Sequence, residues 1–194
     1  LTVGDSIVNY LGKTFTIGNV IPFASLNDPR VPILKGTDAK IPSEDGLTPL
    51  FIQQIWKGRD DPIPMVSGID ARLIEAEAKL NASDFAGMMT ILNALRTAPP
   101  KIGNFQPAAM PAISTTPTTK DAAVTLFFRE KALWQFGRGQ RVSDLRRLVR
   151  QYGRTQDKVF PVGQHYKGVP FGTDVAFPVP DAELVNPQFT GCLD

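Results

Sequence analysis

The chain has 194 residues, enough for one substantial domain, and its 42% hydrophobic residues are an ordinary share for a globular protein. Its 21 basic and 19 acidic residues give a net charge of +2, which is too balanced to favour nucleic acid as the main partner. A single cysteine, Cys192, and a single histidine, His165, exclude an internal disulfide and argue against a transition-metal site, so we expect no metal and no cofactor.

Membrane-spanning segments are not predicted, because no run of about 18 apolar residues is present. The longest uncharged stretch, residues 102–119, is interrupted by Pro107, Pro111 and Pro117. The chain starts at Leu1, without an initiator Met or a signal-peptide pattern, and we interpret it as a processed or truncated product.

Residues 1–66 are rich in glycine and proline between short apolar segments such as 14–17 and 50–55. This pattern predicts an irregular region with a few short strands or helical turns. Because no independent core is visible in it, we expect this region to pack on a helical part that covers residues 67–194.

A first pair of helices is predicted after Gly68. Apolar residues recur at helical spacing over residues 69–80 and again over residues 85–95, with Ser83 as the expected N-cap of the second helix. The second helix ends before Pro99 and Pro100. Because the turn between the two helices is so short, they are expected to pack antiparallel as an αα-hairpin.

A second pair of helices, again an αα-hairpin, is predicted after a long connecting loop at residues 97–119. Thr118 to Asp121 resembles a capping box, and many large apolar residues follow on several faces, which predicts a deeply buried helix that ends at Gly137 and Gly139. The last helix is marked by apolar residues at spacings of three and four and is closed by Gly153: Val142, Leu145, Val149 and Tyr152. After it, loop and extended pieces are expected, including residues 175–180 with their prolines.

No catalytic motif is complete in this sequence, so we expect no catalytic residues and no enzyme activity. The segment 65–68 lacks the first glycine of a nucleophile elbow, and Gly12-Lys13-Thr14 lacks the upstream glycine of a phosphate-binding loop. The acidic pairs Asp60-Asp61 and Glu44-Asp45 are interpreted as turn-forming residues, although two carboxylates that meet only in the fold stay an open alternative.

A ligand-binding role is predicted for Trp56, with Gln54 and Arg59 beside it. Sugar rings present apolar C–H faces that stack on aromatic side chains, while nearby polar side chains bond the hydroxyl groups. The alternative for Trp56 is a core anchor. Trp134, by contrast, lies within the predicted buried helix and is expected in the core.

The basic residues between positions 138 and 158 form a local cluster with only Asp144 and Asp157 as acidic neighbours. We expect most of them to lie on a solvated face and to pair with acids elsewhere in the chain. Binding of a phosphate or another anion is the alternative.

Three segments together form a recognisable pattern. The first is RLIEAEA at residues 72–78, followed by Asn93-Ala94-Leu95-Arg96. The second is FREKALW at residues 128–134, continuing to GQRVSDLRR at residues 139–147. The third is Phe177-Pro178-Val179-Pro180 with Glu183, Asn186 and Pro187. In order and spacing they resemble the C-terminal half of the SusD/RagB family of outer-membrane lipoproteins.

The sequence departs from this family at three places. Arg138 stands where the family has Glu before the glycine, Arg129-Glu130 reverses the family's Glu-Arg, and Gly191-Cys192 replaces its Gln-Asn ending. These departures concern local ion pairs more than the fold.

The resemblance covers residues 62–194 and implies a tetratricopeptide-like helical scaffold. It also implies non-catalytic capture of an oligosaccharide or similar nutrient at the extracellular face of the outer membrane. The implied partner is a SusC-like TonB-dependent transporter, and membrane attachment would be only through a lipid anchor outside this chain. The family's helix motifs imply packing and capping roles, so no ligand contact is transferred from them. The alternative function is a helical-repeat scaffold for protein–protein assembly.

Overall fold

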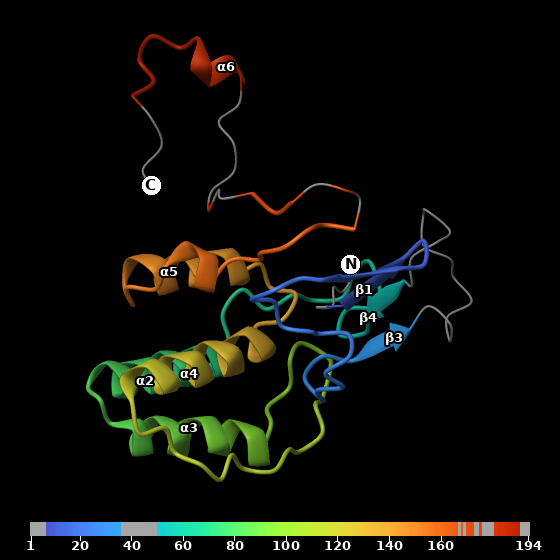
Figure 1. The fold of residues 1–194 in the computed structure, drawn as a ribbon. Helices are drawn as coiled ribbons and strands as arrows, with labels where there is room; N and C mark the ends of the chain where they lie inside the picture. Colours follow the sequence, from blue (N-terminus) through green and yellow to red (C-terminus); the bar gives the residue numbers. More distant parts are fainter. Residues whose placement is uncertain are drawn as a thin grey trace.

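The computed structural model describes residues 7–35, 50–166, 168, 170–172, 175 and 181–190. Within these residues, four helices of ten or more residues are accompanied by four short strands in two small sheets. The helices occupy one side of the molecule and the strands the other (Figure 1). The prediction of a helical protein with a few short strands is therefore confirmed.

The strands form two antiparallel pairs. Strands β1 (Ile7–Tyr10) and β2 (Lys13–Thr16) are joined by Leu11 and Gly12, whose φ angles of 48° and 73° are those of a two-residue hairpin turn. Strands β3 (Ile33–Lys35) and β4 (Phe51–Gln53) make the second pair.

Helices α2 (Gly68–Asn81) and α3 (Phe85–Thr97) confirm the first predicted pair, and they pack side by side (Figure 1). The N-cap of α3 is Asp84, not Ser83, and the Asp84 carboxylate accepts a hydrogen bond from the Gly87 N–H. Ser83 instead completes the preceding turn, because its N–H donates to the Leu80 carbonyl with a φ of 60°.

Helix α4 (Lys120–Trp134) is buried on several faces, as predicted. Its N-cap is Thr119, one residue later than the predicted Thr118, and the Thr119 hydroxyl accepts from the Ala122 N–H. Its largest buried side chains include Phe127 and Trp134, both 0% exposed. The backbone of α4 lies closest to that of α2, so α4 pairs with a helix from the other half of the chain.

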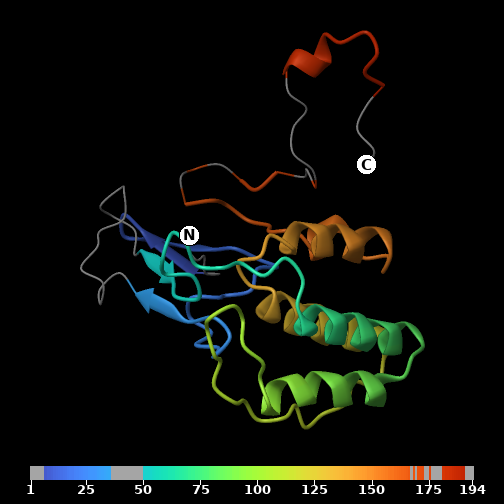
Figure 2. The ribbon, with the colours of Figure 1, turned by 180° about the vertical axis from the view of Figure 1, so that it is seen from behind.

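Helix α5 (Arg141–Arg150) lies across α2 and α4, on the side opposite α3 (Figures 1 and 2). Its predicted inward face was partly wrong. Leu145 is buried as expected, but Val142 is 48% exposed and Leu148 is 5% exposed. The helix is turned so that Asp144 points inward with the leucines.

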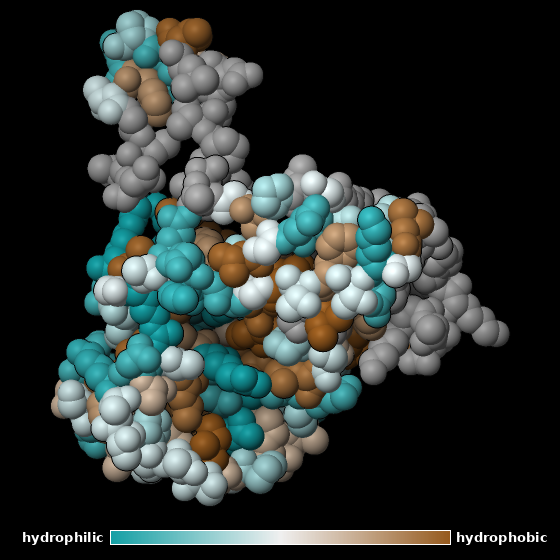
Figure 3. Space-filling model, in the orientation of Figure 1, coloured by the Kyte–Doolittle hydropathy of each residue, from teal (hydrophilic) through white to brown (hydrophobic). Residues whose placement is uncertain are grey.

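Within the first 66 residues, the part that the structure describes shares the core of the helices. Ala24, Val31 and Ile55 belong to the same buried cluster as Leu73 and Trp134. On the face shown in Figure 3, the largest group of apolar side chains lies near the middle, and hydrophilic side chains lie around it. None of the described helices is long and apolar enough to cross a membrane.

The short elements after α5 are the 3₁₀ turn η1 (Gln156–Lys158) and helix α6 (Asp181–Leu184). In both ribbon views α6 lies beyond α5, away from the other helices (Figures 1 and 2). Several predicted features lie outside the described residues: the extended residues 176–180, the pair Glu44-Asp45, and Cys192.

Candidate functional site

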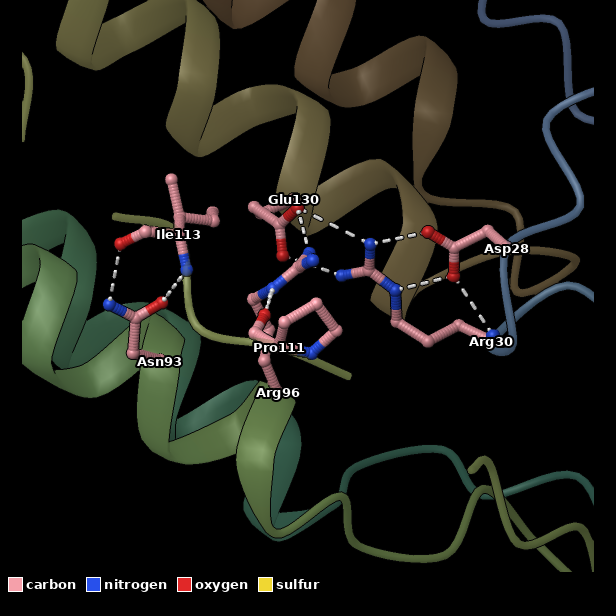
Figure 4. A network of polar contacts seen from close by, with 7 residues as sticks. All are labelled: Asp28, Arg30, Asn93, Arg96, Pro111, Ile113 and Glu130. Atoms are coloured by element: carbon pink, nitrogen blue, oxygen red, sulfur yellow. Dashed lines mark hydrogen bonds and ion pairs between the residues drawn. The ribbon is translucent and has the colours of Figure 1, made fainter. Parts of the chain in front are cut away.

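A buried cluster of ion pairs joins the N-terminal region to α4 (Figure 4). Arg30 is 0% exposed, and its guanidinium donates to Asp28 at 2.7 and 2.8 Å and to Glu130 at 2.6 and 3.3 Å. Glu130 is 5% exposed and also accepts from Arg96 at 2.9 Å. We call Asp28, Arg30, Arg96 and Glu130 the Arg30 cluster.

The ionisation of the Arg30 cluster is set by these pairings. Burial disfavours the charged form of Asp28, but its hydrogen bonds and charge interaction with Arg30 outweigh burial and lower the pKa of Asp28. Burial likewise opposes the charge on Arg30, whereas hydrogen bonds to Asp28 and Glu130 raise the pKa of Arg30. Asp28 and Arg30 therefore stay ionised near neutral pH, and the bonds from Arg30 to Glu130 hold the two parts of the chain together.

The Asn93 and Arg96 pair of α3 binds the long loop before α4 (Figure 4). Asn93 donates to the Ile113 carbonyl at 3.2 Å and accepts from the Ile113 N–H at 2.8 Å. Arg96 donates from Nε to the Pro111 carbonyl at 3.0 Å. These two motif residues thus position a loop.

A second cluster joins α5 to α2. Glu77 accepts from Arg147 and, at 2.7 Å, from the Tyr152 hydroxyl, while Lys131 donates to Asp144 at 2.6 Å. Burial opposes the ionisation of Glu77, but the bonds from Arg147 and Tyr152 outweigh it and lower its pKa. Burial, and then the bond to Glu77, raise the pKa of Tyr152. This cluster explains why α5 turns Asp144 inward.

A third cluster holds the start of α2 to the end of α4. Asp70 accepts from Arg138 at 2.8 and 3.0 Å and from Gln135 at 2.9 Å, and it also accepts from the Ser67 N–H and hydroxyl. Arg138, which departs from the glutamate of the SusD/RagB pattern, therefore has a carboxylate partner of its own. Burial opposes the charge on Asp70, but Arg138, Gln135 and Ser67 lower its pKa to about 2.

Replacing Asp70 with Asn tests this third cluster. The stability that Asp70 contributes is complete above its ordinary pKa of 3.8 and is lost as the pH falls through about 2. We expect D70N to be ~1–2 kcal/mol less stable than the wild type at pH 7, after allowance for solvent screening, and the difference to shrink towards zero at pH 2. Urea unfolding across this pH range measures it, with D60N on an exposed loop as the control. A pH-independent difference would contradict the assignment.

Aromatic side chains line an open cavity of about 710 Å³ at the strand end of the molecule. We call it the hairpin cavity. In the β1–β2 register, Tyr10 lies opposite Lys13 and Val8 opposite Phe15, so alternation places Tyr10, Lys13 and Phe15 on one face of the hairpin. The cavity is lined by that face and by the segment near position 166: Tyr10, Leu11, Lys13, Phe15, Gln164, Tyr166 and Gly168.

The wall of the hairpin cavity that contains Tyr166 is held to the hairpin side by close backbone contacts. Gly18 and Val162 exchange two backbone hydrogen bonds, at 2.9 and 3.3 Å. Gly163 has a φ of 109°, and a Cβ there would lie 2.9 Å from the Thr16 carbonyl oxygen, so only glycine fits. The Asn19 side-chain amide adds bonds to the carbonyls of Asp157 and Phe160.

The rings of the hairpin cavity contact one another across the two walls. Tyr10 and Tyr166 have ring centroids 5.1 Å apart, and His165 contacts both Tyr166 and Phe171. With the amide of Gln164 and the ammonium of Lys13 nearby, the cavity combines apolar ring faces with a few polar groups. This composition is typical of small-ligand sites.

The site residues predicted from sequence lie elsewhere. Trp56 is half-buried against the core, and its ring lies next to Gly137, where a Cβ would be 2.6 Å from Cζ3. The Gln54 side chain donates to the carbonyls of Ile52 and Gln53, and Arg59 is exposed. The three do not line the hairpin cavity, and their ligand role stays a prediction.

The structure also shows the surroundings of Asp61 and of the basic cluster at residues 138–158. Asp61 forms a turn, because its carboxylate accepts from the N–H groups of Lys57 and Gly58, and these bonds lower its pKa. Three residues of the basic cluster pair with acids elsewhere, Arg138 with Asp70, Arg147 with Glu77 and Arg154 with Asp121. Among the residues that the structure describes, no group of three or more metal-ligating side chains is present.

Sequence reasoning missed Tyr10, Phe15 and Tyr166. The local signal for the hairpin was available, since alternating apolar residues flank Leu11-Gly12. The approach of Tyr166 to Tyr10 had no local signal, because it depends on the contact between Gly18 and Val162.

Comparison with models of protein families gave no match, and searches of curated proteins and of solved structures found no similar protein.

Proposed function

We propose that the chain belongs to a non-catalytic binding protein that captures an oligosaccharide or a similar nutrient at the cell surface. The observation that carries the proposal is the hairpin cavity, in which three aromatic rings and two polar side chains line one space. Its volume of about 710 Å³ lies in the range of small-molecule sites. The resemblance of the three sequence segments to the SusD/RagB family supports the same function.

The chemistry of the hairpin cavity suits a sugar. Tyr10, Phe15 and Tyr166 offer apolar ring faces for the C–H face of a pyranose. The side chains of Gln164 and Lys13 supply donors and an acceptor for its hydroxyl groups. Because both walls are joined through backbone contacts, the rings are arranged before the ligand arrives, which reduces the entropy lost on binding.

The helices serve as the support in this proposal. The three polar clusters hold α2, α3, α4 and α5 to one another and to the N-terminal region, and their motif residues bind other parts of the chain. We propose that this support is tetratricopeptide-like, as the SusD/RagB resemblance implies. The same resemblance proposes a SusC-like TonB-dependent transporter as the partner, and an outer-membrane location through a lipid anchor outside this chain.

A protein–protein assembly scaffold is the second candidate. Three apolar side chains just before α2 are unusually exposed, Ile63 at 59%, Met65 at 88% and Val66 at 81%. Apolar groups that gather at a surface mark contact sites for other proteins. A TonB-dependent transporter encoded beside the gene would favour the nutrient-binding function, and its absence would favour assembly.

A glycan-binding screen on the full-length protein tests the proposal, followed by substitutions in the hairpin cavity. We expect Y10A and Y166A each to weaken binding of a captured glycan by about tenfold, since each removes one stacking ring. In the same titrations W56A tests the sequence-predicted site, and thermal melting reports whether each variant is folded. Binding of no glycan, or affinities unchanged by both tyrosine substitutions, would overturn the proposal.

A further inference from the structure

A second cavity, of about 490 Å³, lies beside the Arg30 cluster and is separate from the hairpin cavity. One wall is apolar and comes from three segments distant in sequence, with Leu26, Met110 and Leu126 among its residues. Arg96 and Arg129 also line this cavity. We call it the arginine cavity.

The charges of the arginine cavity do not balance. Three arginines line it, Arg30, Arg96 and Arg129, against the two carboxylates of Asp28 and Glu130, so one positive charge is in excess. Both carboxylates already accept from Arg30, and Glu130 also accepts from Arg96. These acids therefore have little capacity left to neutralise another cation.

Arg96 and Arg129 carry the guanidinium N–H groups that remain for a ligand. Arg96 uses Nε for the Pro111 carbonyl and Nη1 for Glu130, and its Nη2 has no acceptor among the residues that the structure describes. Its side chain is 16% exposed and lines the cavity. Arg129 is exposed on α4 and lines the same space.

We propose that the arginine cavity binds a small carboxylate that carries an apolar body. The carboxylate pairs with Arg96 and Arg129, because a guanidinium matches a carboxylate in shape and charge. The apolar body lies against Leu26, Met110 and Leu126, where it is removed from water. A free acyl acid and the C-terminal residue of an apolar peptide both provide this chemistry.

The test is a titration of the full chain with two carboxylates and with their neutral counterparts, in which NMR detects binding. Octanoate represents the acyl acid and is compared with octanol, and N-acetyl-leucine represents the peptide end and is compared with N-acetyl-leucinamide. We expect at least one carboxylate to bind in the millimolar range and about fivefold more tightly than its neutral counterpart. The carboxylate that binds identifies the source.

Two matched substitutions complete the test. R129Q should weaken carboxylate binding by about fivefold without affecting the neutral counterpart, whereas R72Q, which changes an exposed arginine outside the cavity, should have no effect. The preference for the carboxylate over its neutral counterpart should also decrease at high salt, because exposed charges are screened. Equal binding of charged and neutral probes, equal affinities of R129Q and R72Q, or no saturable binding of either carboxylate would overturn the proposal.

Discussion

Replacing Glu130 with Gln is expected to destabilise the protein by about 3–5 kcal/mol, because it removes one of the two carboxylates that neutralise the buried Arg30. Glu130 is 5% exposed and accepts hydrogen bonds from Arg30, which is 0% exposed, and from Arg96. A glutamine has the same shape but cannot neutralise either guanidinium. Chemical denaturation at pH 7 measures the loss.

The matched control for E130Q is E75Q. Glu75 pairs with Arg72 on the surface of α2, where both side chains are about half exposed, at 53% and 46%. Such pairs contribute little, so we expect E75Q to change stability by less than ~0.5 kcal/mol. A loss of less than ~1 kcal/mol in E130Q would show that the Arg30 cluster does not hold the N-terminal region to α4.

Replacing Leu148 with Ala is expected to cost about 2–5 kcal/mol, since it removes a buried side chain from the underside of α5 and leaves a cavity. Leu148 is 5% exposed and belongs to the core cluster. The same measurement of unfolding by urea reports the loss, and a lowered melting temperature should accompany it.

V142A is the control for L148A on the same helix. Val142 is 48% exposed, and alanine has a higher helix propensity than valine, so the change should be within ~0.5 kcal/mol of zero. The sequence pattern placed Val142 inward, and the two substitutions therefore decide between the two orientations of α5. A larger loss in V142A than in L148A would contradict the structure.

Helix positions were largely predictable because they depend on local repeats. The spacing of Ile69, Leu73, Ala76 and Leu80 requires a helix whichever neighbours it meets, and these residues are all buried in α2. The N-caps moved by one residue, from Ser83 to Asp84 and from Thr118 to Thr119. Adjacent polar residues can each act as a cap, and the geometry of the preceding turn selects between them.

The orientation of α5 was not predictable from its own residues. Both Val142 and Leu148 lie three residues from Leu145, so the apolar spacing allows either to face inward. The inward position of Asp144 and the approach of Arg147 to Glu77 favour Leu148. That choice depends on Glu77 and Lys131, which belong to other helices.

The polar clusters and cavities likewise depend on contacts between segments that are far apart in the sequence. Asn93 and Arg96 stand out as a pair in the sequence, but their partners Ile113, Pro111 and Glu130 lie 15 to 34 residues further along the chain. Arg30 lies 100 residues from Glu130. A spacing rule that covers one helical turn cannot identify such partners.

By itself, the sequence determined the helical class and the positions of the four main helices, because these depend on local periodicity and turn residues. Only the tertiary structure decided which charged residues pair, which face α5 buries and that Tyr166 joins Tyr10 and Phe15 at one cavity. The physical reason is that burial, ion pairing and cavity shape arise from contacts between segments that are far apart in the chain.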